Sequence, residues 1–245
     1  MPTDYDQIAE QYQMAKKSPW RLHIEHFTLF ELLGDLAGKS VLDLACGEGY
    51  YSRALKAAGA ARVLGVDLSA EMIKRARARE AEQPLGIEYR VQDAREFQPD
   101  GGFDLVCAAY LLNYARTREE LLAMYRAVAR ALKAGRRFVT VNDNPGQNPE
   151  TFARSRKYGF IKVVREPVRE GTPIGYIFYL DNESFQIENY HLGLATHEWA
   201  AHAAGLRDIR FHAPRLSGAG SRAFDAGFWD DFLADRPVFF IECHK

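Results

Sequence analysis

The chain has 245 residues, which is enough for one large domain with a hydrophobic core of its own. Its 32 basic residues balance 33 acidic ones, so the formal net charge is -1 at pH 7. Proteins that bind nucleic acids usually carry a basic excess, so this balance argues against a nucleic-acid partner. The three cysteines, Cys46, Cys107 and Cys243, are too few and too scattered for a disulfide framework or a cysteine-based zinc site.

The first residues, MPTDYDQIAEQYQMAKK, are polar and lack the apolar segment of a secretory signal peptide. No apolar run approaches the roughly 20 residues that a membrane-spanning helix needs. We therefore expect a cytoplasmic protein that binds neither a membrane nor a nucleic acid. The sequence does not indicate whether the protein is a monomer or an oligomer.

Residues 1–35 are predicted to form a helical cap at the start of one domain that covers residues 1–245. Pro19 divides the cap into two helices, because proline ends a helical run, and Gly34 closes the second helix.

From residue 40 onward, short apolar segments alternate with amphipathic ones. The predicted strands are 40–44, 62–66, 87–91, 103–109 and 137–142. The predicted helices are 49–58, 69–82 (capped by Ser69) and 117–132. This alternation is typical of a parallel sheet with helices on both faces, and ligands of such sheets bind at the carboxyl ends of the strands.

Residues 145–192 differ in character and are predicted to form a β-rich cap inserted after the fifth strand. They are rich in Tyr, Phe, Ile and Val, with prolines and glycines between the apolar runs. The predicted elements are a loop at 143–156 and strands at 159–164, 174–180 and 184–192. A helix at 196–204 with Thr196 as its N-cap and strands at 207–212 and 237–243 are predicted to follow.

The strongest local signal is VLDLACGEGYYSRAL, residues 41–55, which joins a predicted strand to a predicted helix. The small residues of its loop, 45–49, let the backbone approach a ligand closely. The loop departs from the three-glycine fingerprint of dinucleotide sites, and Asp43 and Glu48 would repel a pyrophosphate. These acidic groups favour a cationic, amine-bearing ligand instead.

Two further carboxylates follow predicted strands. Asp67 ends the second strand, where an acidic side chain can accept both hydroxyls of a ribose. Asp93 ends the third strand and is placed to receive the amino group of an adenine. Together with the acidic loop, the two carboxylates indicate S-adenosylmethionine rather than NAD.

Five motifs in this order resemble those of class I S-adenosylmethionine-dependent methyltransferases. They are DLACGEG (43–49), GVDLS (65–69), QDA (92–94), FDLVCAAYLLNY (103–114) and LKAGRRFV (132–139). The resemblance implies a Rossmann-like α/β fold with a seven-stranded sheet, whose last strand, 237–243, is antiparallel and lies beside 207–212.

The resemblance also implies a binding site for S-adenosylmethionine. Ala45 stands where the family usually has its first glycine, and Leu68 and Met72 would enclose the adenine ring. The residues implied to bind this cofactor are Tyr12, Trp20, Arg21, Ala45, Gly47, Gly49, Asp67, Leu68, Met72, Asp93, Ala94 and Ala109.

The N-terminal IAEQYQ and KKSPWRLHIE segments, taken with DLACGEGYYSR, are similar to small-molecule N-methyltransferases of the toxoflavin-synthase kind. This narrower resemblance favours a small heteroaromatic acceptor that is methylated on nitrogen. Three alternatives stay open: O-methylation of a small metabolite, an NAD-dependent dehydrogenase, and a module that binds S-adenosylmethionine without turnover.

The acceptor is expected over the ends of the fourth and fifth strands, between the two caps. Aromatic walls suit a planar acceptor and also favour a sulfonium methyl group. The predicted substrate-binding residues are Tyr5, Asn113, Tyr114, Tyr176 and His191. The candidates for a catalytic residue are Tyr5, Tyr114, Asn142 and His191. The AAYLLNY segment after the fourth strand carries no acidic ligand, so no metal is expected.

Overall fold

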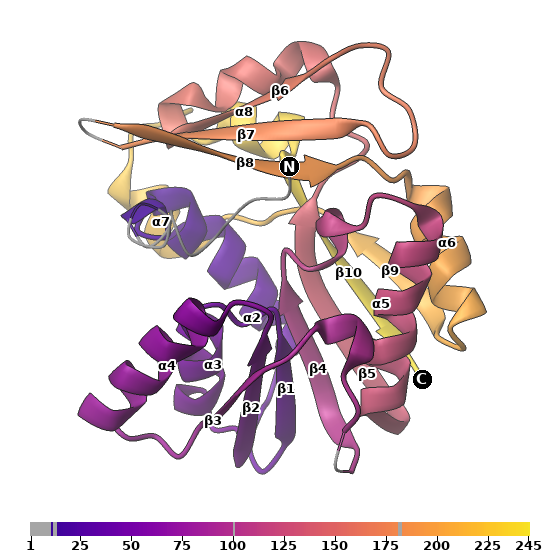
Figure 1. Ribbon diagram of the computed structural model, residues 1–245. Coiled ribbons are helices and arrows are strands. Elements are labelled where there is room, and N and C mark those ends of the chain that lie inside the picture. Colours follow the sequence, from indigo (N-terminus) through magenta and orange to yellow (C-terminus); the bar gives the residue numbers. More distant parts are fainter. Residues whose placement is uncertain (1–10, 12–13, 100, 181–182) are drawn as a thin grey trace.

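A seven-stranded sheet forms the centre of the computed structural model, with strand order β3-β2-β1-β4-β5-β10-β9 (Figure 1). The structure describes residues 11, 14–99, 101–180 and 183–245, so Tyr5 and Tyr12 lie outside the described residues. β10 runs antiparallel to both of its neighbours, β5 and β9, and the other pairs are parallel. The predicted sheet and its antiparallel last strand are therefore confirmed. The strands are β1 (Ser40–Leu44), β2 (Arg62–Asp67), β3 (Glu88–Val91), β4 (Phe103–Ala109), β5 (Leu132–Asp143), β9 (Arg207–His212) and β10 (Val238–His244).

Helices cover both faces of the sheet, because successive side chains of a strand point to opposite sides. Val41 and Leu105 belong to one buried cluster, whereas their neighbours Leu42 and Val106 belong to the other. In Figure 1, α3 and α4 lie to the left of the sheet and α5 and α6 to the right. The α-helices are α2 (Phe27–Leu33), α3 (Tyr50–Ala57), α4 (Ala70–Glu82), α5 (Arg118–Ala131), α6 (Leu194–Ala203), α7 (Gly218–Ala223) and α8 (Asp230–Asp235).

A side-chain cap fixes where α4 begins, whereas α6 begins without one. Ser69 accepts a hydrogen bond of 3.0 Å from the Met72 amide, which confirms the predicted start of α4. The predicted cap at Thr196 is wrong. Helix α6 already begins at Leu194, because the carbonyl of Gly193 accepts the first helical hydrogen bond, from the His197 amide at 3.1 Å.

A second, three-stranded antiparallel sheet lies above the carboxyl ends of the main strands (Figure 1). It consists of β6 (Phe160–Val164), β7 (Pro173–Tyr179) and β8 (Ser184–Tyr190). The loop predicted at 143–156 is wrong in its second half, where the 3₁₀-helix η4 (Pro149–Tyr158) forms. Asn148 starts this helix by accepting a hydrogen bond of 3.1 Å from the Glu150 amide.

A buried ion pair joins the small sheet to the end of β5. The ammonium of Lys162 on β6 contacts the carboxylate of Asp143 and donates a 2.6 Å hydrogen bond to the Pro237 carbonyl. The hydroxyl of Tyr176 on β7 donates to the same carboxylate. Burial lowers the pKa of Lys162, and Asp143 acts in the opposite direction. The small sheet is therefore held to the main sheet by charge as well as by packing.

The second helix predicted in the N-terminal cap, which Gly34 closes, consists of the π-helix η1 (Arg21–His26) followed by α2. Other short elements have no counterpart among the predictions, such as α7 and α8 with six residues each. Short 3₁₀-helices, η2 (Ala94–Glu96) and η3 (Leu112–Tyr114), follow β3 and β4. Among the residues that the structure describes, no helix combines the length and the apolar character that crossing a membrane requires.

Candidate functional site

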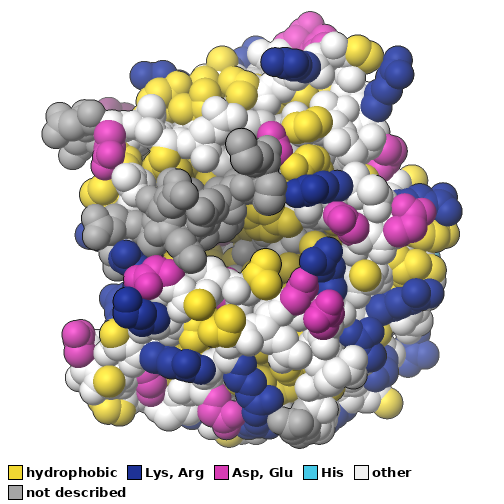
Figure 2. Space-filling model, in the orientation of Figure 1, with side chains coloured by type: hydrophobic (Ala, Val, Ile, Leu, Met, Phe, Trp, Pro, Cys, Tyr) yellow, Lys and Arg dark blue, Asp and Glu magenta, His cyan; other side chains and the backbone are white. Residues whose placement is uncertain are grey.

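A cavity of about 430 Å³ lies at the carboxyl ends of the central strands, beneath the small sheet. Figure 2 shows the surface hollowed between the two sheets, with hydrophobic side chains visible in the hollow. A volume of this order is typical of a site for a small molecule. The residues predicted to bind a cofactor that line the cavity are Arg21, Ala45, Gly47, Asp67, Leu68, Met72, Asp93, Ala94 and Ala109.

The loop after β1 brings the backbone to the cavity in left-handed conformations. Ala45 has a φ of 58° and Gly47 a φ of 55°, values that residues with a Cβ atom rarely adopt. Gly49 also has a positive φ, but it does not line the cavity. A side chain at Gly49 would collide with the ring of Tyr89, so this glycine serves the packing of α3 against β3.

Two carboxylates lie beneath this loop. Asp67 accepts hydrogen bonds from the amides of Gly47 (2.7 Å) and Ser69 (2.9 Å). Asp43 accepts a 2.6 Å hydrogen bond from Ser52 at one oxygen, and its other oxygen is buried with no partner among the described residues. Burial raises the pKa of Asp67 and raises that of Asp43 to about 7. A cationic ligand would therefore meet a buried carboxylate with one oxygen that has no hydrogen-bond partner among the described residues.

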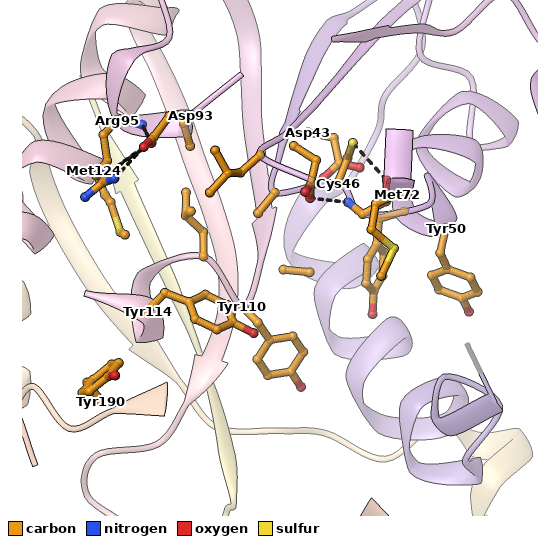
Figure 3. A pocket seen from close by; sticks show the side chains of 18 of the residues that line it. Asp43, Cys46, Tyr50, Met72, Asp93, Arg95, Tyr110, Tyr114, Met124 and Tyr190 are labelled. Carbon is orange, nitrogen blue, oxygen red and sulfur yellow. Dashed lines mark hydrogen bonds and ion pairs between the residues drawn. The ribbon is translucent and has the colours of Figure 1, made fainter. Parts of the chain in front are cut away.

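The opposite side of the cavity is formed by residues after β3 and on α5 (Figure 3). Here the guanidinium of Arg95 binds both oxygens of Asp93, at 3.1 and 2.6 Å, and this hydrogen bonding lowers the pKa of Asp93. Asp93, the predicted partner of an adenine amine, is thus already paired with Arg95. Leu68, at the rim, is 69% exposed, which leaves an apolar surface for a ring to cover.

A cluster around Glu25 forms another wall, and the predictions name Arg21 from it but not Glu25. Glu25 is buried and forms an ion pair of 2.9 Å with Arg21, one helical turn earlier. The hydroxyls of Tyr51 and Tyr110 both donate to its carboxylate. In the sequence, the spacing of Arg21 and Glu25 indicates an ion pair along a helix. It gives no sign of the two tyrosines, because they come from distant segments.

Aromatic residues line the part of the cavity next to the small sheet. Tyr110 and Tyr114, which follow β4, lie side by side in Figure 3, and Tyr190 on β8 lies beyond them. The Tyr190 hydroxyl donates a 2.6 Å hydrogen bond to Glu188, and the Arg116 guanidinium lies 5.4 Å from the Tyr190 ring centroid. Of the predicted substrate-binding residues that the structure describes, Tyr114 lines the cavity.

Other predicted site residues lie elsewhere, because they pack in the core. Trp20 is 3% exposed, with its ring centroid 5.1 Å from that of Phe160. Asn142 accepts a 3.2 Å hydrogen bond from the Leu112 amide, so its side chain supports the backbone after β4. Asn113 is buried beside it and does not line the cavity.

Tyr176 and His191 are also displaced from the predicted position. The hydroxyl of Tyr176 is turned toward Asp143, away from the main cavity. His191 lines a smaller cavity of about 170 Å³ on the other side of Asp143. Among the described residues, no cluster of three or more His, Cys, Asp or Glu side chains could hold a metal ion.

Comparison with known protein families matches residues 41–135 to the family described as "Methyltransferase domain". This segment contains the loop after β1, Asp67, Asp93 and Tyr110, which together line the cavity. The matched segment is a methyltransferase domain, and its motifs are similar to those of the class I S-adenosylmethionine-dependent family. The match covers four of the five motifs in full and residues 132–135 of the fifth.

Curated relatives of the methyltransferase domain include the ubiquinone biosynthesis O-methyltransferase of Xanthomonas oryzae pv. oryzae. It is 36% identical over 115 residues, which cover 45% of this chain and 46% of that protein. A protein of the same description from Bordetella parapertussis is 34% identical over 119 residues, 47% of this chain and 48% of that protein. The chain spans about half the length of the curated relatives it matches.

Among solved structures, an S-adenosylmethionine-dependent methyltransferase from Mesorhizobium loti has a TM-score of 0.64 at 22% identity. The alignment covers 94% of this chain and all of that one. At this identity the likeness shows a shared fold. It extends over the small sheet as well as the methyltransferase domain.

The cavity of the methyltransferase domain fits S-adenosylmethionine. The buried oxygen of Asp43 that has no partner among the described residues suits a cationic amino-acid end, Asp67 at the end of β2 would hold a ribose, and Leu68 presents an apolar surface. Bound there, S-adenosylmethionine supplies an electrophilic methyl group on a positively charged sulfur.

Proposed function

We propose that this chain transfers a methyl group from S-adenosylmethionine to a small molecule held beneath the small sheet. One observation carries the proposal: a single cavity is lined both by residues of the family motifs, such as Asp67 and Met72, and by the aromatic residues Tyr110, Tyr114 and Tyr190. Donor and acceptor would therefore meet in one enclosed space.

In this proposal the protein acts mainly by alignment. The leaving group is activated by its own charge, so the walls have to orient the acceptor and keep water away. Residues 1–35 and 145–192 would serve as the two caps that cover the acceptor. Tyr114 and Tyr190 would stack against a planar ring.

The nature of the acceptor is proposed on two grounds. The aromatic wall and the toxoflavin-synthase-like N-terminal segments favour a heteroaromatic acceptor methylated on nitrogen. The matched relatives are named O-methyltransferases, which favours oxygen as a second candidate. All three cysteines are buried and unpaired, which supports a reducing compartment such as the cytoplasm.

Calorimetric titration with S-adenosylmethionine and S-adenosylhomocysteine tests the donor half of the proposal. We expect Asp67→Ala to weaken donor binding by roughly 1.5–3 kcal/mol, because charge-assisted hydrogen bonds are lost. Asp104→Asn is the control. Asp104 accepts a hydrogen bond from the Ser40 amide at the start of β4, at the end of the sheet away from the cavity. Wild-type protein that binds neither compound would overturn the proposal, and binding of NADH instead would favour a dehydrogenase.

A further inference from the structure

The carboxylate of Glu25 joins side chains from three segments of the chain. Arg21 Nη1 lies 2.9 and 3.1 Å from its two oxygens, and Tyr51 and Tyr110 each donate a hydroxyl hydrogen bond to one of them. Tyr51 comes from α3 and Tyr110 from the residue after β4. All four residues line the cavity, so the cluster faces the bound ligands.

A contribution to the stability of the fold does not by itself explain why these polar groups are buried together. Glu25 is 1% exposed, and burying an ion pair is often no better for stability than packing apolar residues of similar size. A buried carboxylate with two tyrosine hydroxyls beside a ligand cavity is instead the composition of a site that handles protons.

Tyr110 is the member of the cluster with an unusual backbone. Its φ is 66°, in the left-handed region that a tyrosine rarely adopts, and its amide donates a 2.8 Å hydrogen bond to the Val141 carbonyl. The Arg21 guanidinium lies 5.4 Å from the centroid of the Tyr110 ring. Strained residues held in this way cluster at functional sites. The strain positions the ring between Glu25 and the aromatic wall.

The chemistry of a phenol suits this position. Tyr110 donates its proton to Glu25, and a phenol oxygen has two lone pairs, so it can accept a proton from a ligand as it gives up its own. Tyr51 also contacts Glu25, but it is buried on α3, on the side of the loop after β1. Tyr110 lies next to Tyr114, on the side of the proposed acceptor (Figure 3).

On the basis of the proposed function, we propose that Tyr110 and Glu25 form a proton relay and that the acceptor is a hydroxyl or N–H compound. The acceptor atom bonds to the methyl carbon while the carbon–sulfur bond breaks, and sulfur keeps the electron pair. The acceptor proton passes to the Tyr110 oxygen, and the Tyr110 proton passes to Glu25. Release of that proton to solvent leaves the methylated acceptor, S-adenosylhomocysteine and one proton.

In this relay Tyr110 is the catalytic residue, and Glu25 acts through it as a positioning residue. Several titratable groups face Glu25. These groups are Lys16, Arg21, His26, Tyr50, Tyr51 and Tyr110. Burial lowers the pKa of His26, so its ring adds little positive charge at neutral pH.

The test compares acceptors of one shape that differ in whether the nucleophile carries a proton. 2-Naphthol and 2-naphthylamine carry one, whereas the ring nitrogen of isoquinoline does not. The variants are Tyr110→Phe and Glu25→Gln. Tyr125→Phe is the matched control, because it removes another buried hydroxyl, the one 3.1 Å from His197 Nδ1, outside the cavity.

We expect Tyr110→Phe and Glu25→Gln to slow methylation of 2-naphthol or 2-naphthylamine by about 10²–10⁴-fold, the usual contribution of proton transfer. Their effect on isoquinoline, and on the dissociation constant of S-adenosylhomocysteine, should match that of Tyr125→Phe. The rate of Tyr110→Phe with 2-naphthol should rise in proportion to hydroxide concentration, as ionisation in solution replaces the relay.

Equal losses with all three acceptors would overturn the relay and leave the cluster with a structural role. Methylation of isoquinoline alone by the wild-type protein, or of none of the three despite normal binding of S-adenosylhomocysteine, would also overturn it. Failure to bind S-adenosylhomocysteine at all would be a failure of the proposed function itself.

Discussion

The hydroxyl of Ser52 donates a 2.6 Å hydrogen bond to one oxygen of Asp43, while the second oxygen of this carboxylate is buried without a partner among the described residues. Burial in this position raises the pKa of Asp43 to about 7. The loop after β1 therefore offers a carboxylate that is only partly ionised at neutral pH. A ligand with a positive charge would complete its ionisation.

Donor binding should therefore depend on pH. A cationic donor binds the ionised form of Asp43, so affinity for S-adenosylmethionine should fall by about tenfold between pH 8 and pH 6, in proportion to the ionised fraction. Calorimetric titrations at both pH values measure this, and Asp43→Asn should bind more weakly with little dependence on pH. Equal wild-type affinities at the two pH values would contradict the assignment.

The same carboxylate should reduce the stability of the protein without ligand. Its folded pKa is above that of the unfolded chain, so the folded state holds the proton more tightly between about pH 4 and pH 7, and the free energy of unfolding falls as pH rises through this range. Asp43→Asn should therefore unfold at higher urea concentration than wild type at pH 8, and this advantage should vanish near pH 4. A variant less stable than wild type at pH 8 would contradict this account.

The ion pair between Lys162 and Asp143 should matter far more than pairs on the surface. Lys162→Met leaves a buried carboxylate without its cation, which is expected to lower the free energy of unfolding by about 3–5 kcal/mol. Lys74→Met, which removes an exposed partner of Glu71, is the control and should change it by less than about 1 kcal/mol. Urea unfolding measures both, and similar losses in the two variants would argue against anchoring of the small sheet by charge.

Much of the fold could be predicted from hydrophobic periodicity. The predicted strands 103–109 and 207–212 have the bounds of β4 and β9, since a run of apolar residues marks the first and alternation marks the second. The π-helix η1 has no such signal. Within this helix Glu25 contacts two tyrosines that lie far away in the sequence.

The candidate site was predictable where strand ends determine it and not where packing does. Asp67 and Asp93 line the cavity because parallel strands end at one edge of the sheet. Tyr176 and His191 were predicted from their place in an aromatic segment, but the carboxylate of Asp143 draws the Tyr176 hydroxyl away from the cavity. Alternation along a strand does not reveal which side chain finds a buried partner.

Removing the small sheet should separate donor binding from methyl transfer. When residues 150–190 are replaced by a short glycine-rich link, donor affinity should stay within about tenfold, because the donor residues lie on β1 to β3 and their loops. Methyl transfer should fall to background, since Glu188 and Tyr190 are lost from the cavity. Circular dichroism checks the fold of this variant, and retained turnover would place the acceptor beneath the N-terminal helices alone.

The most direct test of the whole account is methyl transfer itself. The wild-type protein is incubated with methyl-labelled S-adenosylmethionine and a library of small heteroaromatic hydroxyl and amino compounds, and label in product is measured against release of S-adenosylhomocysteine. We expect at least one compound to take up label in a one-to-one ratio with S-adenosylhomocysteine, and Asp67→Ala to abolish this at low donor concentration. Tight donor binding with S-adenosylhomocysteine formed no faster than background for every compound would contradict the account and leave a binding module without turnover.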